Sequence, residues 1–228
     1  FVEGGRISGG SHIGGLAGEA RFTVVAHCHT NTEVDGSWYV GGLLGGNSGS
    51  VEHSYSLSEV SGNCYIGGLV GYGQIEHTRR RSTGQTTWHG GIISNCHAAG
   101  RVSGDEGIGG LVGGLYEGTV TRSYATASVI GNYRAGGLVG MNNSEITSCY
   151  AASDVTGNDT TGGLVGENWE RIANSYATGA VVGTERVGGL VGCSMGGIRN
   201  CYSIGVVSGE LQTGGLVGAG RSYYHGIL

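Results

Sequence analysis

A five-residue word, Gly-Gly-Leu-Val-Gly, recurs through this chain of 228 residues at a nearly constant spacing. Exact copies begin at residues 67, 109, 136, 162, 188 and 214, and the near-copies GGLAG and GGLLG begin at 14 and 41. Successive copies are 27, 26, 42, 27, 26, 26 and 26 residues apart. A fixed period of this size indicates a repeat architecture, in which each repeat packs on its neighbours. The one long interval predicts an inserted loop at about residues 76–91.

Other apolar positions keep the same period. A β-branched residue lies eight positions before the second glycine of each word, at 7, 34, 60, 102, 129, 155, 181 and 207. Such residues, alternating with Ser, Thr and Gly, predict short strands, and glycine at this density disfavours helices. The sequence therefore predicts an all-β fold. We expect a right-handed parallel β-solenoid (β-helix) of about eight coils of 26 residues with three short strands each, forming a single domain over residues 1–228. The glycines are expected at tight corners, where they supply positive φ and permit close stacking of the coils.

The composition excludes several classes of protein. The chain has 51 glycines but no proline, which excludes a collagen-like helix. Its net charge of −5 offers no basic surface, so no nucleic-acid partner is expected. No apolar run approaches the roughly 18 residues that a membrane span needs, so no membrane insertion is expected. The chain begins with Phe1 rather than Met, which favours a processed or truncated product.

No cofactor, metal or catalytic site is predicted. The word GGLVG matches neither the GxGxxG fingerprint nor the lysine-containing P-loop. His27, Cys28 and His29 have a spacing that suggests a metal site, but on a strand Cys28 points away from both histidines. The four aspartates are scattered along the chain and form no catalytic pair. A polysaccharide-processing β-helix is the enzymatic alternative, and it would need clustered carboxylates in a cleft on one face.

Two further columns of like residues are expected along the solenoid. Cysteine and serine alternate at 28, 54, 96, 123, 149, 175 and 201. Cysteines two coils apart are separated by about 9.6 Å, whereas a disulfide needs Cα atoms within about 7 Å, so free thiols are predicted. The adjacent column holds His29, Tyr55, His97, Tyr124, Tyr150, Tyr176 and Tyr202. We interpret it as a stacked ladder, with an aromatic strip for sugar or partner contact as the alternative.

The complete repeat, N-C/S-Y-A-x-G-x-V-x-G-x4-G-G-L-V-G, resembles the GLUG-motif repeats of large bacterial surface proteins. These include stretches of the immunoglobulin A peptidases and of adhesin-like proteins, and the resemblance covers nearly the whole chain. It implies a right-handed β-helix that is extracellular or on the surface of a bacterial cell. It implies no catalysis, because the zinc motif HExxH of those peptidases does not occur in this sequence. We therefore expect that the chain is not an enzyme.

The inserted segment is a possible binding loop. It contains Arg79, Arg80, Arg81 and Trp88, and arginine and tryptophan are typical of interfaces. A surface excursion without function is the alternative for this loop. Two sequons, at Asn142 and Asn158, are candidate glycosylation sites in a host that uses them.

The two ends of a solenoid are open sheet edges, which are ready to pair with another chain. Phe1 is expected to align with the cysteine column, and Ile227 and Leu228 end close to it. A second copy that followed Leu228 would reach its own Gly14 28 residues after Gly214, close to the period. We therefore expect copies of the chain to stack head to tail into a fibre, with Phe1, Val2, Ile227 and Leu228 in contact. The alternative is an adhesin stalk or binding module, for a glycan or a surface protein, cut from a longer protein.

Overall fold

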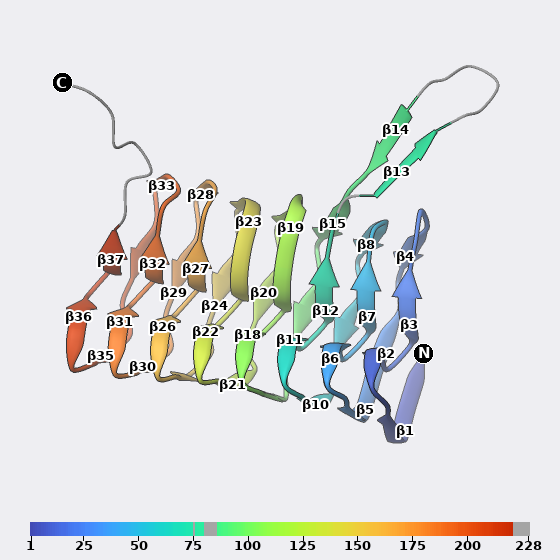
Figure 1. Ribbon diagram of the computed structural model, residues 1–228, viewed down its shortest axis with the longest axis horizontal. Helices are drawn as coiled ribbons and strands as arrows, with labels where there is room; N and C mark the ends of the chain where they lie inside the picture. The colour runs from blue at the N-terminus through green and yellow to red at the C-terminus, as the bar shows by residue number, and fades with distance from the viewer. Residues whose placement is uncertain (75, 80–85, 221–228) are drawn as a thin grey trace.

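The protein is a rod of stacked coils. In the computed structural model, which describes residues 1–74, 76–79 and 86–220, the chain forms a parallel β-solenoid of about eight turns (Figure 1). Three parallel sheets run along the rod, as predicted, and each coil adds one rung to each sheet. In most coils the first and third sheets are interrupted by a bend, so that one rung consists of two short strands. No helix among the described residues is long and apolar enough to cross a membrane.

The three sheets take their strands at regular intervals along the chain. Sheet 1 contains β1 (Val2–Ser8), β5 (His29–Asp35), β9 (Tyr55–Ser56), β10 (Glu59–Ser61), β16 (His97–Ala98), β17 (Arg101–Ser103), β20 (Tyr124–Ala125), β21 (Ser128–Ile130), β24 (Tyr150–Ala151), β25 (Val155–Thr156), β29 (Tyr176–Ala177), β30 (Val181–Val182), β34 (Tyr202–Ser203) and β35 (Val207–Ser208). Sheet 2 contains β2 (Ser11–Gly14), β6 (Trp38–Gly41), β11 (Cys64–Gly67), β18 (Glu106–Gly109), β22 (Tyr133–Gly136), β26 (Asp159–Gly162), β31 (Glu185–Gly188) and β36 (Leu211–Gly214). Sheet 3 contains β3 (Ala17–Ala20), β4 (Val24–Ala26), β7 (Leu44–Asn47), β8 (Ser50–Glu52), β12 (Val70–Gly73), β15 (Gly91–Ser94), β19 (Val112–Thr121), β23 (Val139–Thr147), β27 (Val165–Asn168), β28 (Ile172–Ala173), β32 (Val191–Ser194), β33 (Ile198–Arg199) and β37 (Val217–Gly220).

The registers are those that the period predicts. In sheet 1, Val60 pairs with Val34 on one side and with Val102 on the other. Because each side chain lies over its counterpart in the next coil, the apolar columns form a continuous core along the rod. The leucine of the repeated word lies in this core and is fully buried in six coils, as Leu43, Leu69, Leu111, Leu138, Leu164 and Leu190.

The glycines of the repeated word are required by close packing of the backbone, as we predicted, but the positive φ that we also predicted for them is wrong. A Cβ added to Gly162 would lie 2.0 Å from the carbonyl oxygen of Val165, and one added to Gly163 would lie 2.1 Å from that of Gly189. Only Gly4, Gly5, Gly100 and Gly107 among the described glycines have positive φ. The word therefore makes a tight inward bend at which any side chain would collide with the backbone.

The corners whose backbone has positive φ, in the left-handed region, are instead occupied mostly by residues larger than glycine. One such corner lies two positions before the glycine pair in each coil, at His12, Tyr39, Tyr65, Gly107, Arg134, Thr160, Arg186 and Gln212. The φ values of Arg134, Thr160 and Arg186 are 55°, 59° and 54°, a region that non-glycine residues rarely adopt. Such strain is retained where neighbouring structure enforces it, and it often accompanies a functional site.

The inserted segment leaves the solenoid as an antiparallel hairpin of β13 (Glu76–Arg79) and β14 (Thr86–His89), visible at the right of Figure 1. The coil closes normally beneath it, since Ile93 pairs with Val51 and Val120. Arg79 therefore lies in β13 and Trp88 in β14. Arg80, Arg81, Ile227 and Leu228 lie outside the described residues.

All six cysteines are free thiols. In the alternating column, the amide of Cys149 donates a hydrogen bond to the hydroxyl of Ser175 at 3.1 Å, and that of Cys96 donates to Ser123 at the same distance. Cysteine and serine thus share one column, in which serine hydroxyls accept hydrogen bonds from the cysteine amides of the preceding coil. Burial, which disfavours the thiolate, raises the pKa of Cys96 to about 11 and that of Cys149 to about 12.

These buried thiols predict a loss of stability at alkaline pH. The folded state keeps a proton that the unfolded chain releases near pH 9, so stability is full below about pH 9 and falls as the pH rises toward 12. We expect Cys149→Ser to leave the urea midpoint at pH 7 nearly unchanged, because Ser123 and Ser175 already occupy this column. Its midpoint should fall less than that of the wild type between about pH 9 and pH 11. Equal alkaline losses in the two proteins, measured by circular dichroism, would contradict this assignment.

Candidate binding groove

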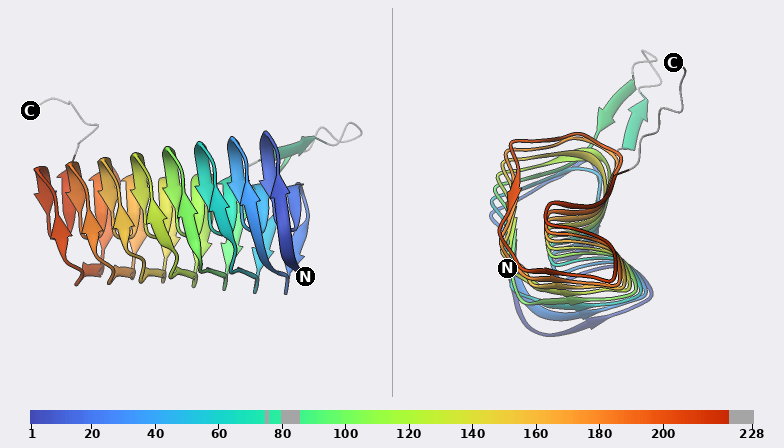
Figure 2. Two further views of the ribbon diagram at one scale, coloured as in Figure 1. Left: turned by 90° about the horizontal axis from the view of Figure 1, so that it is seen from below. Right: turned by 90° about the vertical axis from the view of Figure 1, so that its left-hand side faces the viewer.

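The chain of each coil folds inward on one side of its cross-section, a notch in the backbone path that the right-hand view of Figure 2 shows. The strands of sheet 2 lead into the notch, the repeated word bends at its inner end, and the strands of sheet 3 lead out. The last glycine of the word allows the backbones of sheets 2 and 3 to approach each other closely. A Cβ on Gly166 would lie 2.6 Å from the carbonyl carbon of Arg134 in the preceding coil. The notches of successive coils are stacked, and hollows lined by residues of several coils lie along them, so that they form a groove along the rod axis.

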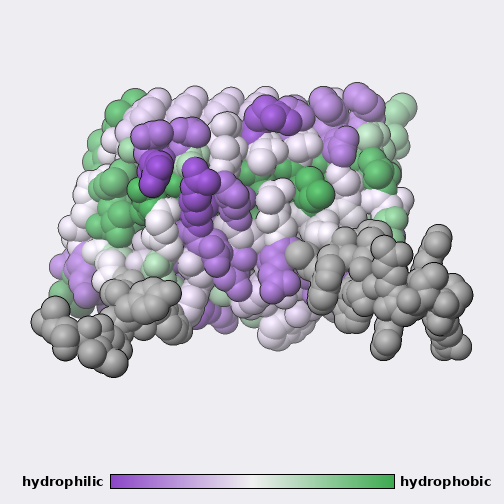
Figure 3. All heavy atoms as spheres, turned by 90° about the horizontal axis from the view of Figure 1, so that it is seen from above, coloured by the Kyte–Doolittle hydropathy of each residue, from purple (hydrophilic) through white to green (hydrophobic). Residues whose placement is uncertain are grey.

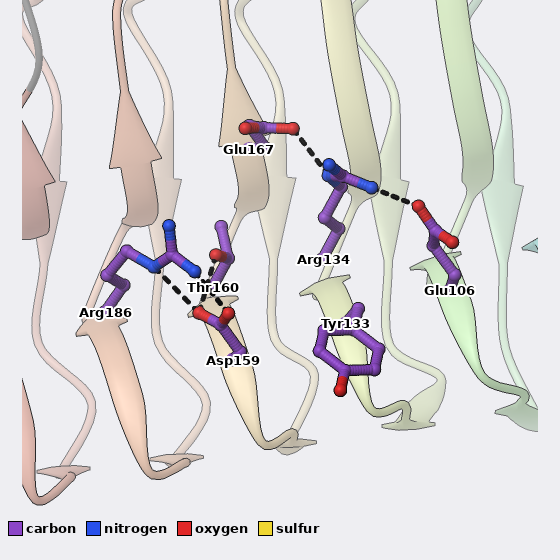
Figure 4. A pocket seen from close by; sticks show the side chains of 7 residues that line it. All are labelled: Glu106, Tyr133, Arg134, Asp159, Thr160, Glu167 and Arg186. Carbon is purple, nitrogen blue, oxygen red and sulfur yellow. Dashed lines mark hydrogen bonds and ion pairs between the residues drawn. The ribbon is translucent and has the colours of Figure 1, made fainter.

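Two columns of side chains line this groove. One consists of the left-handed residues of sheet 2, and the other follows the last glycine of the word in sheet 3, at Glu19, Gly46, Tyr72, Gly114, Met141, Glu167, Cys193 and Ala219. A left-handed residue breaks the two-residue alternation of a strand. As a result, the side chain of Arg134 turns into the groove although Tyr133 beside it is exposed (Figure 4).

The amino-terminal half of the groove is aromatic. The ring centroids of His12 and Tyr39 are 4.8 Å apart, those of Tyr39 and Tyr72 are 5.0 Å apart, and those of Tyr72 and Tyr116 are 5.6 Å apart. Tyr65 packs edge-on against Tyr72 at 5.4 Å. Burial raises the pKa of both Tyr65 and Tyr72 to about 12, so these phenols are neutral hydrogen-bonding groups at physiological pH.

The carboxyl-terminal half is charged. Arg134 joins three coils: its guanidinium group contacts the carboxylate of Glu106 in the preceding coil and donates a hydrogen bond of 2.6 Å to Glu167 in the following coil. Arg186 is similarly paired with Asp159 (Figure 4). Burial tends to lower the pKa of Arg134, but Glu167 and Glu106 outweigh this effect and raise it. The hydrogen bond from Arg186 to Asp159 likewise raises the pKa of that arginine, so the ion pairs favour the charged form of both side chains.

Two adjoining hollows lie along this charged half. The first is lined by Tyr133, Thr160 and the ion pairs of Arg134 and Arg186, and the second by Tyr116, Met141, Asn143, Glu167 and Trp169. The Arg134–Glu167 pair borders both hollows, so they form one continuous surface. Carboxylates, guanidinium groups and exposed aromatic rings there offer many hydrogen-bonding groups beside apolar surfaces. No group of three His, Cys, Asp or Glu side chains within the described part of the chain is arranged to hold a metal ion.

This groove is the candidate site that sequence reasoning missed. The pairing of Arg134 with Glu167 spans 33 residues, which is one period of 26 plus the seven residues between the two groove columns. The signal was therefore present as two columns, two residues before and five residues after the first glycine of each word. The carboxylates that pair with Arg134 belong to glutamates, whereas the sequence analysis considered only aspartates as a catalytic pair.

The predicted aromatic column forms a ladder of rings on sheet 1. Tyr124 and Tyr150 stack with centroids 4.8 Å apart and ring planes 3° from parallel, and the other pairs lie between 4.8 and 5.2 Å. His97 lies within the ladder, and burial lowers its pKa. Phe1 stacks on His29, so it extends this column and not the cysteine column as we predicted. The difference of one residue comes from Gly4 and Gly5, whose positive φ values form a bulge in β1.

The two sequons differ in accessibility. The side chain of Asn142 is buried, and its amide nitrogen donates hydrogen bonds of 2.7 Å to the carbonyl oxygen of Ser144 and to the side chain of Asn168. Asn142 is therefore a rung of an internal amide ladder, and the candidate glycosylation site at this position is wrong for the folded protein. Asn158 is exposed.

The face that carries the hairpin mixes small apolar patches with polar residues (Figure 3).

Comparison with known proteins places the repeat in a family. A family model described as "The GLUG motif" matches four consecutive segments, 104–130, 131–156, 157–182 and 183–208. Residues 104–208 are GLUG repeats. Each GLUG repeat contains one strand of sheet 2 and the glycine-rich bend, so these four repeats build the charged half of the groove, including Arg134, Glu167 and Arg186. No curated protein and no solved structure is matched by the chain.

Proposed function

We propose that this chain is a non-enzymatic, structural β-solenoid, located outside a bacterial cell or on its surface, that stacks head to tail on copies of itself to form a fibre. The observation that carries the proposal is the state of the first and last coils that the structure describes. Leu190 is fully buried, whereas its counterpart Leu216 in the last coil is 39% exposed. Among the residues that the structure describes, the strands β35, β36 and β37 also pair on one side only, and such edges are templates for further pairing.

The first coil has the residues that this last coil needs as partners. Ile7, Gly14 and Leu16 occupy the same columns as Val207, Gly214 and Leu216. Each pairing within the rod joins like columns in this way. A second copy would therefore continue sheets 2 and 3 and the core in register, and sheet 1 with the same one-residue shift at Gly4 and Gly5 that β1 shows against β5. A contact between different ends of identical chains does not close on itself, and therefore propagates into a filament.

Analytical ultracentrifugation and negative-stain electron microscopy of the purified chain test this proposal. We expect the sedimentation coefficient to rise with concentration and rods longer than one molecule to form. Leu216→Arg should prevent this assembly, because it places a charge on the apolar end, while leaving the circular dichroism spectrum unchanged. Leu57→Arg, which replaces a 43% exposed leucine on the side of the rod, is the matched control and should assemble normally. A wild type that stays monomeric at millimolar concentration, or a Leu216→Arg variant that assembles equally, would refute head-to-tail stacking.

An adhesin stalk or binding module is the second candidate function. The observation that favours it is the groove, whose charged side chains are fixed by ion pairs between coils and whose aromatic residues are accessible. The projecting hairpin with Arg79 and Trp88 is a second possible contact surface of such a module. This function and fibre formation use different surfaces, since stacking needs the ends of the rod and binding needs its side.

A further inference from the structure

We propose that the charged half of the groove binds a neutral, extended oligosaccharide, which lies parallel to the rod axis with about one sugar unit per coil. This inference rests on the binding-module function above and is independent of fibre formation. It concerns the two adjoining hollows along β22, β26, β27 and β31.

The polar groups of these hollows suit hydroxyl groups. The carboxylates of Glu106, Asp159 and Glu167 accept hydrogen bonds, and the guanidinium groups of Arg134 and Arg186 donate them. Planar groups of both kinds recognise neighbouring hydroxyls of one sugar ring, because each can contact two atoms at once. A sugar hydroxyl both donates and accepts, so it can join an existing ion pair without displacing either partner.

The aromatic residues of the hollows supply the apolar contacts that a sugar ring also needs. Trp169 is 37% exposed and Tyr133 is 47% exposed, and they lie in different hollows on the two sides of the Arg134–Glu167 pair. The carbon-bound hydrogens on one face of a sugar ring can pack on such rings while its hydroxyls reach the charged groups. Tyr116 and Met141 extend the apolar side of the second hollow.

The charge of the site favours a neutral ligand over an anionic or a cationic one. The first hollow contains three carboxylates and two guanidinium groups, and each of these carboxylates is already paired with an arginine. An anionic sugar would have to compete with Glu167 and Asp159 for their arginines, and a cation would meet Arg134 and Arg186. The exposed fractions of the Glu167 and Arg186 side chains, 15% and 19%, show that these pairs are largely shielded from water.

The geometry of the groove favours an extended chain. Equivalent side chains in successive coils repeat at the strand spacing, as shown by the distance of 4.8 Å between the stacked rings of Tyr124 and Tyr150. A β-1,4-linked sugar unit advances its chain by close to this spacing, so successive units would meet equivalent positions of successive coils. A coiled oligosaccharide would leave the straight groove after a few units.

Isothermal titration calorimetry with cellohexaose tests this inference, with maltohexaose and hexagalacturonate as the coiled and the anionic comparison. We expect saturable binding of cellohexaose by the wild type and at least tenfold weaker binding of both comparison ligands. Trp169→Ala and Arg134→Gln should each weaken cellohexaose binding at least tenfold. Phe22→Ala, which removes a 43% exposed ring outside the groove, should bind like the wild type.

The inference is overturned if the wild type does not bind cellohexaose up to its solubility limit, or if Trp169→Ala binds as tightly as Phe22→Ala. Equal or tighter binding of hexagalacturonate would refute a neutral ligand, and equal binding of maltohexaose would refute an extended one. Thermal melting of each variant verifies that it is folded. Because Arg134 and Trp169 do not lie in the first or the last coil that the structure describes, a negative result here would leave head-to-tail stacking unaffected, and the sedimentation test of that proposal is independent.

Discussion

Gly136→Ala should unfold the middle of the rod, although it adds a single methyl group. The new Cβ would lie 2.0 Å from the carbonyl oxygen of Val139, 2.6 Å from the amide nitrogen of Gly166 and 2.8 Å from the carbonyl carbon of Val139. All three atoms belong to the backbone, so no side-chain rearrangement relieves the collision, and the bend or the neighbouring coil must move. We expect the free energy of unfolding to fall by more than about 4 kcal/mol in urea titrations followed by circular dichroism.

Gly197→Ala is the matched control for this substitution. A Cβ added at Gly197 would have no heavy atom within 4 Å, so the change in stability should stay within about 0.5 kcal/mol. Since coils in a solenoid are stabilised mainly by their neighbours, Gly136→Ala should also divide the single unfolding transition into two. Similar stabilities of the two variants would show that the glycines of the word are not required for close packing.

Leu138→Ala should cost about 4 kcal/mol of stability, near the upper part of the range for buried leucines. Leu138 is fully buried. Its backbone is hydrogen-bonded to both adjacent coils, with Leu138 N to Leu164 O at 2.8 Å and Leu111 N to Leu138 O at 2.9 Å. These bonds fix the spacing of the coils, so the cavity left by the missing atoms cannot collapse. Thermal and urea denaturation of the purified variant measure the effect.

Leu57→Ala removes the same atoms from a leucine that is 43% exposed. Because water already reaches this side chain and no closed cavity forms, the expected loss is below about 1 kcal/mol. If both leucine variants lost equal stability, the column of leucines would not be the core of the rod.

The sequence alone was sufficient to predict the solenoid and its registers. A glycine pair in every coil fixes the phase, so counting residues from it correctly placed Val34, Val60 and Val102 over one another. The same counting failed by one residue at Phe1, where the bulge at Gly4 and Gly5 adds a residue that carries no signal in the period. Periodicity therefore predicts pairing where coils are equal in length, and loses accuracy where a bulge changes the length.

The groove was not predicted, because counting residues reveals its two columns but not the backbone conformation that turns their side chains toward each other. Arg134, Thr160 and Arg186 are left-handed without being glycine, and only the packing of sheet 2 against sheet 3 enforces that conformation. A strand with regular alternation would place these side chains differently. The repeated word was recognised as the source of the period, but its role in bending the chain inward became visible only with the backbone contacts of Gly162, Gly163 and Gly166.

The hairpin of β13 and β14 shows that the length of this rod and the segments that project from it do not depend on each other. Ile93 pairs with Val51 and Val120 as if the extra residues before it did not exist. Adding a coil lengthens the rod along its axis, whereas adding residues at this corner extends it sideways and leaves every register unchanged. Length and display can therefore change independently: gene duplication would alter how far the rod reaches, and a single insertion would alter what it presents. The same corner offers a natural position for grafting a foreign peptide.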